Sequence, residues 1–104
     1  MRNREDLHDV LKEALGSKYE NHLYFQPPTS VKMCYPCIRY SRTHILNKYA
    51  DNDPYYQGHS YEVIVIDPDP DSEIVTRVSR LPQIRHDRHY TADQLNHDVF
   101  TIFY

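Results

Sequence analysis

The chain has 104 residues, 39% of them hydrophobic, which suffices for one domain with a modest core. Its formal net charge of −3 argues against a nucleic-acid-binding protein, because phosphate binding normally needs a basic stripe. No apolar run approaches the roughly 20 residues of a membrane span. The first residues, MRNREDLHDV, lack the apolar centre of a signal peptide, so we expect synthesis in the cytoplasm, with both cysteines reduced.

The first predicted element is an amphipathic helix from Asn3 to Leu15. Its apolar residues recur at the spacing of one helical face, and they are Leu7, Val10, Leu11, Ala14 and Leu15. Asn3 is the expected N-cap, and Gly16 is a natural end for the helix.

Strands are predicted next. Residues 22–28, HLYFQPP, indicate a short strand that ends at two prolines, and residues 35–42, YPCIRYSR, alternate as in a half-buried strand. The stretch from Thr43 to Ser60 reads as a long loop, and loops of that length in a compact domain are usually functional. Residues 61–67, YEVIVID, are apolar on both faces, which predicts a strand that is central in the sheet or buried on its second face by a partner.

A second helix is expected within residues 67–82, with Asp69 as its cap and Pro70 in its first turn. Its predicted buried stripe consists of Ile74, Val78 and Leu81. Residues 83–90 and 97–104 then resemble strands joined by the turn TADQLN. The order α-β-β-β-α-β-β predicts a single α+β domain, residues 1–104, whose antiparallel sheet carries both helices on one face.

The two cysteines, Cys34 and Cys37, form a C-x-x-C motif. A redox site would need the first cysteine at a helix N-terminus, but the residues after Cys37 alternate as a strand. Zinc would need two further ligands, and His86 and His89 could supply them only across 48 intervening residues, unlike a compact zinc knuckle. We therefore expect Cys34 and Cys37 to pack around the start of a core strand, and we predict neither a metal nor a cofactor.

The most enzyme-like stretch is RHDRHY, residues 85–90, where Arg, His and Asp could perform acid–base chemistry on a phosphodiester. On a regular strand, however, His86 and His89 would lie on opposite faces, so a sheet edge or subunit interface is the preferred interpretation. DNDPYY, residues 51–56, lacks the ordered oxygen ligands of an EF-hand loop. No Gly-rich phosphate loop or nucleophile elbow occurs, and no catalytic residue is predicted.

The sequence does carry residues suited to assembly. Tyr and Arg are enriched at protein interfaces because they bury large areas and keep a polar group. The candidate interface residues are Tyr49, Asp51, Asp53, Tyr55, Tyr56, Arg85, Arg88, Phe103 and Tyr104.

Four stretches together resemble small proteins encoded in the tail and head–tail-connection regions of long-tailed bacteriophages and prophages. They span nearly the whole chain: REDLHDVLKEALGS, YFQPPTSVKMCYPCIRY, DNDPYYQGHSYEVIVIDPDPDSEI and YTADQLNHDVFTIFY. The most specific parts are YPCI, VIDPDPDS and YTADQLNHDVF.

The resemblance implies a virion structural protein similar to tail-terminator or tail-completion proteins. In that class a small α/β subunit forms a ring, commonly a hexamer, between the tail tube and the neck. The expected partners are therefore copies of the chain itself, the major tail protein and neck or connector proteins, and the expected location is the virion tail. Another connector or minor capsid role, a small nuclease using residues 85–90, and a metal- or thiol-dependent regulator using Cys34 and Cys37 are the alternatives.

Overall fold

The computed structural model describes residues 4–27, 32–50 and 53–103, and for residues 44–59 it describes the backbone alone. Along the chain lie α1 (Arg4–Leu15), β1 (Leu23–Phe25), β2 (Cys37–Ala50), β3 (Asp53–Asp67), α2 (Glu73–Ser79), β4 (Ile84–Ala92) and β5 (Leu95–Phe103). This order confirms the predicted α+β domain. Within the described residues, no helix is long and apolar enough to cross a membrane.

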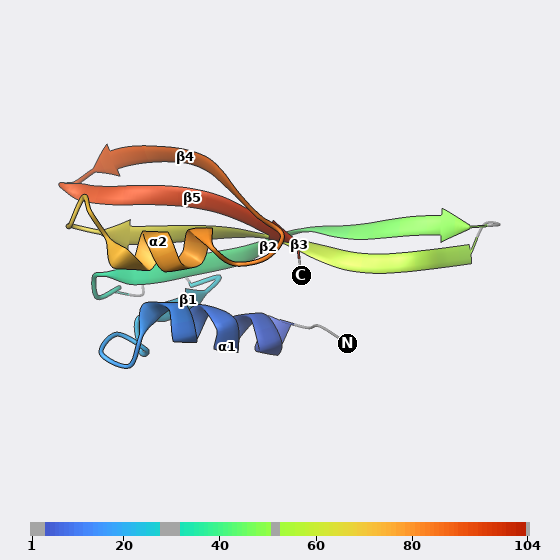
Figure 1. The fold of residues 1–104 in the computed structure, drawn as a ribbon, viewed down its shortest axis with the longest axis horizontal. Helices are drawn as coiled ribbons and strands as arrows, with labels where there is room; N and C mark the ends of the chain where they lie inside the picture. The colour runs from blue at the N-terminus through green and yellow to red at the C-terminus, as the bar shows by residue number, and fades with distance from the viewer. Residues whose placement is uncertain (1–3, 28–31, 51–52, 104) are drawn as a thin grey trace.

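The strands form one sheet in the order β1-β2-β3-β5-β4, with β3 at its centre as predicted (Figure 1). The sheet is mixed rather than wholly antiparallel, because β1 pairs with β2 in parallel, from Leu23↔Ile38 to Phe25↔Tyr40. The two strands therefore run in the same direction, which a direct hairpin connection would not allow. The other strand pairs are antiparallel.

The core lies between the two helices and one face of the sheet, as the sequence predicts. Cross-strand pairs Ile38↔Val65, Tyr40↔Val63 and Tyr61↔Ile102 place apolar side chains on this face. The helices cover it with buried side chains at their predicted stripes: Leu7, Leu11, Ala14 and Leu15 from α1, and Ile74 and Val78 from α2. Leu81 is only partly buried against the same cluster.

The ends of the helices match the prediction only in part. Gly16 follows α1 with φ of +87°, a backbone conformation that glycine adopts without strain. Asn3, the expected cap of α1, lies outside the described residues. α2 begins later than predicted, and Ser72 rather than Asp69 holds its N-cap position. Asp69 instead accepts the backbone N–H of Asp71 at 2.9 Å, which stabilises a turn ahead of the helix.

The prediction of a loop from Thr43 to Ser60 is wrong. β2 runs on to Ala50 and β3 begins at Asp53, and the two strands pair along this whole length (Figure 1). An antiparallel ladder satisfies the backbone groups that an 18-residue irregular segment would leave to water. We call residues 44–50 and 53–59 the arm; it projects from the body and sets the long dimension of 51 Å, against 25 and 23 Å across.

The β4–β5 hairpin closes with a tight turn at Asp93 and Gln94, both at positive φ (53° and 63°), as in a type I′ turn. β4 departs from regular pairing between His86 and Arg88, where a register shift marks a β-bulge. This irregularity changes which side chains share a face.

Candidate functional site

The arm is the feature that sets this molecule apart from a simple two-layer domain. It leaves the body at a second irregularity, between Arg42 and His44 on β2. There the Thr43 hydroxyl donates to the backbone oxygen of Ser60, at 2.9 Å, and lies 3.0 Å from the Ser60 hydroxyl. Because bulges bend and twist a strand, this contact sets the direction in which the arm leaves the sheet.

The arm contains several of the predicted interface residues. Tyr49 and Tyr56 lie near its end, at register positions Tyr49↔Pro54 and Lys48↔Tyr56, and Asp53 and Tyr55 lie on the same part of β3. Asp51 and Tyr104 fall outside the described residues. Phe103 lies at the base of the arm, where it pairs with Ser60.

Arg85 and Arg88 lie on the sheet face that carries no helix, away from the tip of the arm. Arg85 Nε donates to Asp87 Oδ1 at 2.7 Å, and Thr101 donates to the other carboxylate oxygen of Asp87. These contacts, with that of Thr101 the largest, lower the pKa of Asp87. Arg88 lies over the ring of Tyr90, which stacks on His97 with 4.6 Å between ring centres. The result is an ordered polar surface with two exposed guanidinium groups.

The prediction that His86 and His89 of β4 lie on opposite faces of the sheet is wrong. The bulge puts one extra residue between them, so His86 and His89 both point to the helix-covered side of the sheet. There His86 Nε2 lies 3.1 Å from Asp98 Oδ1, and its ring packs edge-on against Phe100. His89 Nε2 lies 3.3 Å from Asn96 Oδ1.

The surroundings of this histidine pair are acidic. An open pocket beside His89 is lined by Asp71 and Asp98, together with Pro70, Ser72, Val75 and Thr76. Among the residues that the structure describes, no Lys or Arg lines it. Carboxylates without a compensating cation repel a phosphodiester, so the pocket is poorly suited to nucleic-acid cleavage.

The cysteines differ from each other in their environment. Cys37 is fully buried at the start of β2, as expected, and burial raises the pKa of its thiol to about 12. Cys34 is exposed before the strand begins, so the prediction that it packs into the core is wrong. Across the described residues, no three His, Cys, Asp or Glu side chains are grouped as metal ligands.

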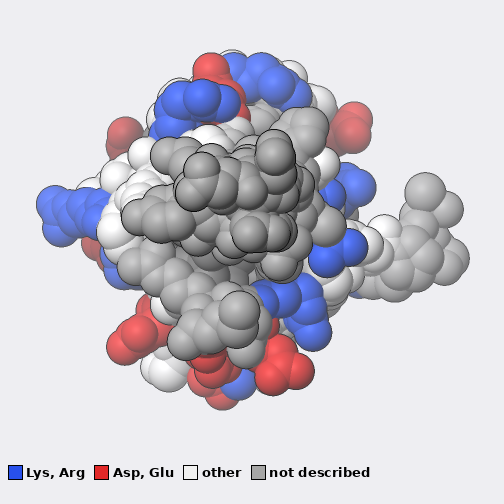
Figure 2. All heavy atoms as spheres, turned by 90° about the vertical axis from the view of Figure 1, so that its right-hand side faces the viewer, with Lys and Arg blue, Asp and Glu red and all other residues white. Residues whose placement is uncertain are grey.

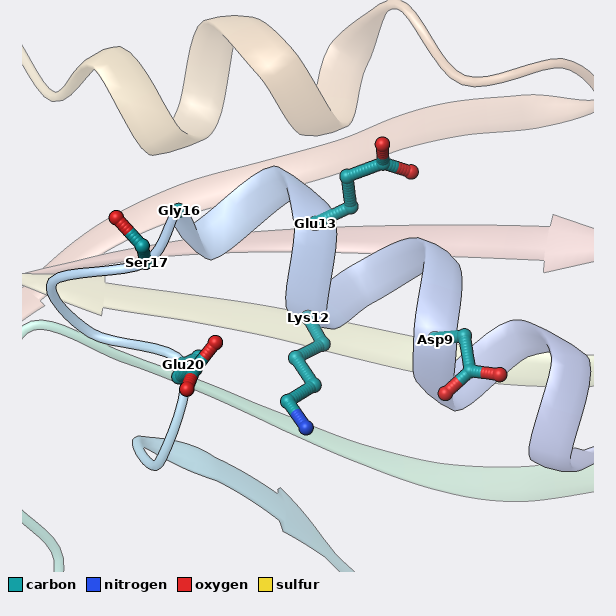
Figure 3. A pocket seen from close by; sticks show the side chains of 6 residues that line it. All are labelled: Asp9, Lys12, Glu13, Gly16, Ser17 and Glu20. Carbon is teal, nitrogen blue, oxygen red and sulfur yellow. The ribbon is translucent and has the colours of Figure 1, made fainter.

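A second pocket lies along α1 and the turn that follows it (Figure 3). It is lined by Asp9, Lys12, Glu13, Gly16, Ser17 and Glu20. The side chains of Lys12 and Asp9 point to one side of the helix and that of Glu13 to the other, so they do not converge on a ligand. This surface is a solvated acidic helix face.

Charged side chains are unevenly distributed over the body. Figure 2 looks toward the arm end: Lys and Arg are prominent on the β4 side, whereas Asp and Glu are most numerous on the α1 side, and each side also carries some of the other sign. Arg85 and Arg88 are exposed on β4, and Asp9 and Glu13 are exposed on α1 together with Lys12. Such a molecule presents complementary surfaces to a second copy placed beside it.

Sequence reasoning missed both the arm and the bulge. A signal for the arm was present, because Asp51–Asp53 is a turn-like run between two segments of similar length. The bulge carries no comparable signal, since RHDRHY contains no glycine and alternates poorly in either register. Comparison with protein-family models and with curated proteins finds no match to this chain.

Proposed function

We propose that the chain is a structural protein of a bacteriophage virion, a ring-forming tail-terminator or tail-completion protein that joins the tail tube to the head–neck complex. The resemblance of its sequence to such proteins motivates the proposal. The observation that carries it is the arm, a ladder of backbone pairs that extends beyond the body.

A ring of identical subunits needs two different contact surfaces on each subunit, because its interfaces are heterologous. The basic β4 side and the acidic α1 side supply such a pair. Arg85 and Arg88 are exposed on β4, and Asp9 and Glu13 are exposed on α1. The protein acts through these surfaces and the arm, binds the major tail protein and neck proteins as partners, and is not an enzyme. It is made in the host cytoplasm and resides in the virion tail.

The direct test has two parts. Size-exclusion chromatography with light scattering should give a mass several times that of the 12.5 kDa subunit, six times for a hexamer. Deletion of the gene from its prophage should then yield separate heads and tails by electron microscopy, and the gene supplied in trans should restore infectious particles. Normal infectious particles from the deletion strain would contradict the proposal.

One observation favours a second candidate, a small phosphodiesterase. The bulge brings His86 and His89 onto one face beside Asp98, an arrangement that acid–base chemistry could use. The acidic pocket argues against it. Hydrolysis of single-stranded RNA or DNA that disappears in His86→Ala/His89→Ala, but persists in the control His97→Ala, a partly buried histidine of β5, would establish this activity.

A further inference from the structure

The two outer edges of the arm lack strand partners in the part of the chain that the structure describes. On β2, the parallel partner β1 ends at Phe25↔Tyr40, and the Gln26 side chain then accepts the backbone N–H of Arg42 at 3.2 Å. On β3, the pairing with β5 ends at Ser60↔Phe103. Beyond these points, and among the described residues, 45–50 and 53–59 pair only with each other.

A two-stranded hairpin on its own is marginally stable in water. Natural proteins protect exposed sheet edges with charges, bulges or short strands, because unpaired backbone groups otherwise recruit another strand. β4, the outermost strand of the body, is protected in this way by its central bulge and by Arg85, Asp87 and Arg88. Its edge is therefore a poor template for pairing.

The arm is not protected to the same degree. Its register shifts lie at its two ends, which leaves an uninterrupted ladder from His44↔Ser60 to Lys48↔Tyr56. Along β2 from Thr43 to Ala50, Lys48 is the single Lys, Arg, Asp or Glu, and no proline occurs. Strand-favouring residues occur on both arm strands, Ile45 and Tyr49 on β2 and Tyr55 and Tyr56 on β3, whereas Asp53 and Pro54 of β3 lie at the end of the ladder. These features are typical of an edge that another strand covers.

We propose that the arms of adjacent copies pair edge to edge in the ring, β2 of one subunit against β3 of the next, so that together they close a small β-barrel. The inference deepens the proposed function and rests on it. In a ring with cyclic symmetry all arms point the same way, while β2 and β3 of each arm run in opposite directions. Contact between β2 of one copy and β3 of the next is therefore antiparallel.

The lengths of the two edges support this pairing. Residues 44–50 of β2 lie opposite residues 53–60 of β3, which carry one extra residue at the register shift, so the two edges are of similar length and each can be covered along most of it. Pairing of β2 with β2 of a second copy would instead give a closed dimer and leave both β3 edges open. Only the cyclic arrangement pairs both edges of every arm, and a closed barrel has no edges left.

Cross-linking between two separately purified variants tests the pairing. Both carry Cys34→Ser/Cys37→Ala; one adds Asn47→Cys on β2 and the other adds Gln57→Cys on β3. After mixing and reassembly, a short bismaleimide should give cross-linked dimers that contain one subunit of each variant. Thr91→Cys, an exposed position near the β4–β5 turn and outside the proposed contact surfaces, is mixed with Asn47→Cys as the matched control and should give none. Cross-linking within Asn47→Cys alone, or to Thr91→Cys, would overturn the proposed pairing.

A second variant separates this inference from the proposed function. Replacing Leu46–Gly58 with Asn-Gly keeps the pair Ile45↔His59 next to a two-residue hairpin turn and removes the rest of the arm. We expect a folded monomer where the full chain forms a ring. A shortened chain that still forms the ring would overturn arm pairing but leave the proposed function intact. The opposite result is also possible: the full-length chain could give the arm cross-links yet neither form rings nor restore infectious phage. That result would overturn the proposed function but not the pairing of the arms.

Discussion

Tyr40 shows how a single polar aromatic residue can serve a small core. Its side chain is 1% exposed and contacts the rings of Phe25 and Tyr61, with 4.8 and 6.3 Å between ring centres. Its hydroxyl lies 2.6 Å from His8 Nδ1 on α1. Burial raises the pKa of Tyr40, so the phenol stays protonated and donates to a neutral His8. This contact fixes α1 on the sheet.

The same contact makes stability depend on pH. Burial, with help from Arg4 and Lys12 and opposed by Asp9, lowers the pKa of His8 below its usual 6.5. The unfolded chain therefore binds the His8 proton more tightly than the folded protein does. The contribution of His8 is constant above about pH 6.5, and stability falls as the pH drops from there to the lowered pKa of the folded state.

We expect the wild-type urea midpoint to fall more between pH 7.5 and 5 than that of His8→Gln, which cannot take up the proton. Tyr40→Phe keeps His8 but removes its hydroxyl partner, and should lower the midpoint at pH 7.5. Equal losses in the wild type and His8→Gln on acidification would show that His8 is not the responsible group.

The two cysteines should differ sharply in alkylation. A thiol with a pKa of about 12 is almost wholly protonated at pH 8, and Cys37 is also fully buried. Brief treatment with iodoacetamide should add one group to the native protein, at Cys34, and two groups in urea, as read by mass spectrometry. Cys37→Ser should cost about 1–3 kcal/mol of stability, because it buries a hydroxyl without a prepared partner. Two additions to the native protein would contradict this environment for Cys37.

Which side chains share a face could be predicted only where the strand is regular. Tyr61, Val63 and Val65 alternate without interruption, and all three are buried as expected. His86 and His89 could not be placed, because the bulge between them follows from pairing with β5 rather than from local sequence. The site beside them was therefore not predictable from the residues of β4 alone.

At the scale of the elements, hydrogen bonds from the guanidinium group of Arg77 connect the two helices. Arg77 on α2 donates through Nε to the Ala14 backbone oxygen at 2.5 Å, and its Nη2 lies 3.4 Å from the Leu15 oxygen. These carbonyls belong to the last turn of α1, which has no helical partners for them and carries partial negative charge. Arg77 thus caps α1 from a distance of 62 residues along the chain.

Arg77→Ala should therefore lower the free energy of unfolding by about 1–2 kcal/mol, the range for a partly exposed, charge-assisted hydrogen bond. The matched control is Arg80→Ala, which removes an exposed arginine at the end of the same helix. Urea unfolding followed by circular dichroism measures both. If Arg77→Ala and Arg80→Ala lower the free energy of unfolding equally, Arg77 does not cap α1.

The elements themselves were largely predictable. The stripe from Leu7 to Leu15 and the alternation of residues 61–67 carry strong periodic signals, and both elements form where expected. The arm was not predictable in the same way, because Asp51–Asp53, Pro54 and Gly58 are typical loop residues. A long ladder overrides such local preferences when two segments can pair along their whole length. The parallel pairing of β1 is likewise a property of the sheet rather than of LYF.

At the scale of the whole molecule, the body and the arm differ in what stabilises them. The described hydrophobic core lies between the helices and the part of the sheet that ends near Tyr61 and Ile102. The ladder of the arm lies beyond that point. Apolar burial supplies most of the folding free energy, and we therefore expect the arm to contribute little to the stability of the monomer.

The shortened chain in which Asn-Gly replaces Leu46–Gly58 should therefore keep the unfolding midpoint of a single subunit, within a few degrees. The connection between Ile45 and His59 is shorter in this variant, and closing a shorter connection costs less entropy. This gain offsets part of any loss of stability. The comparison must be made at concentrations where the full chain is also monomeric, since assembly itself raises the apparent melting temperature. Differential scanning calorimetry over a dilution series gives the melting temperature of the single subunit and its increase on assembly. A shortened chain that melts far below the full monomer would place the arm within the folding unit, and its edges would then serve stability instead of assembly.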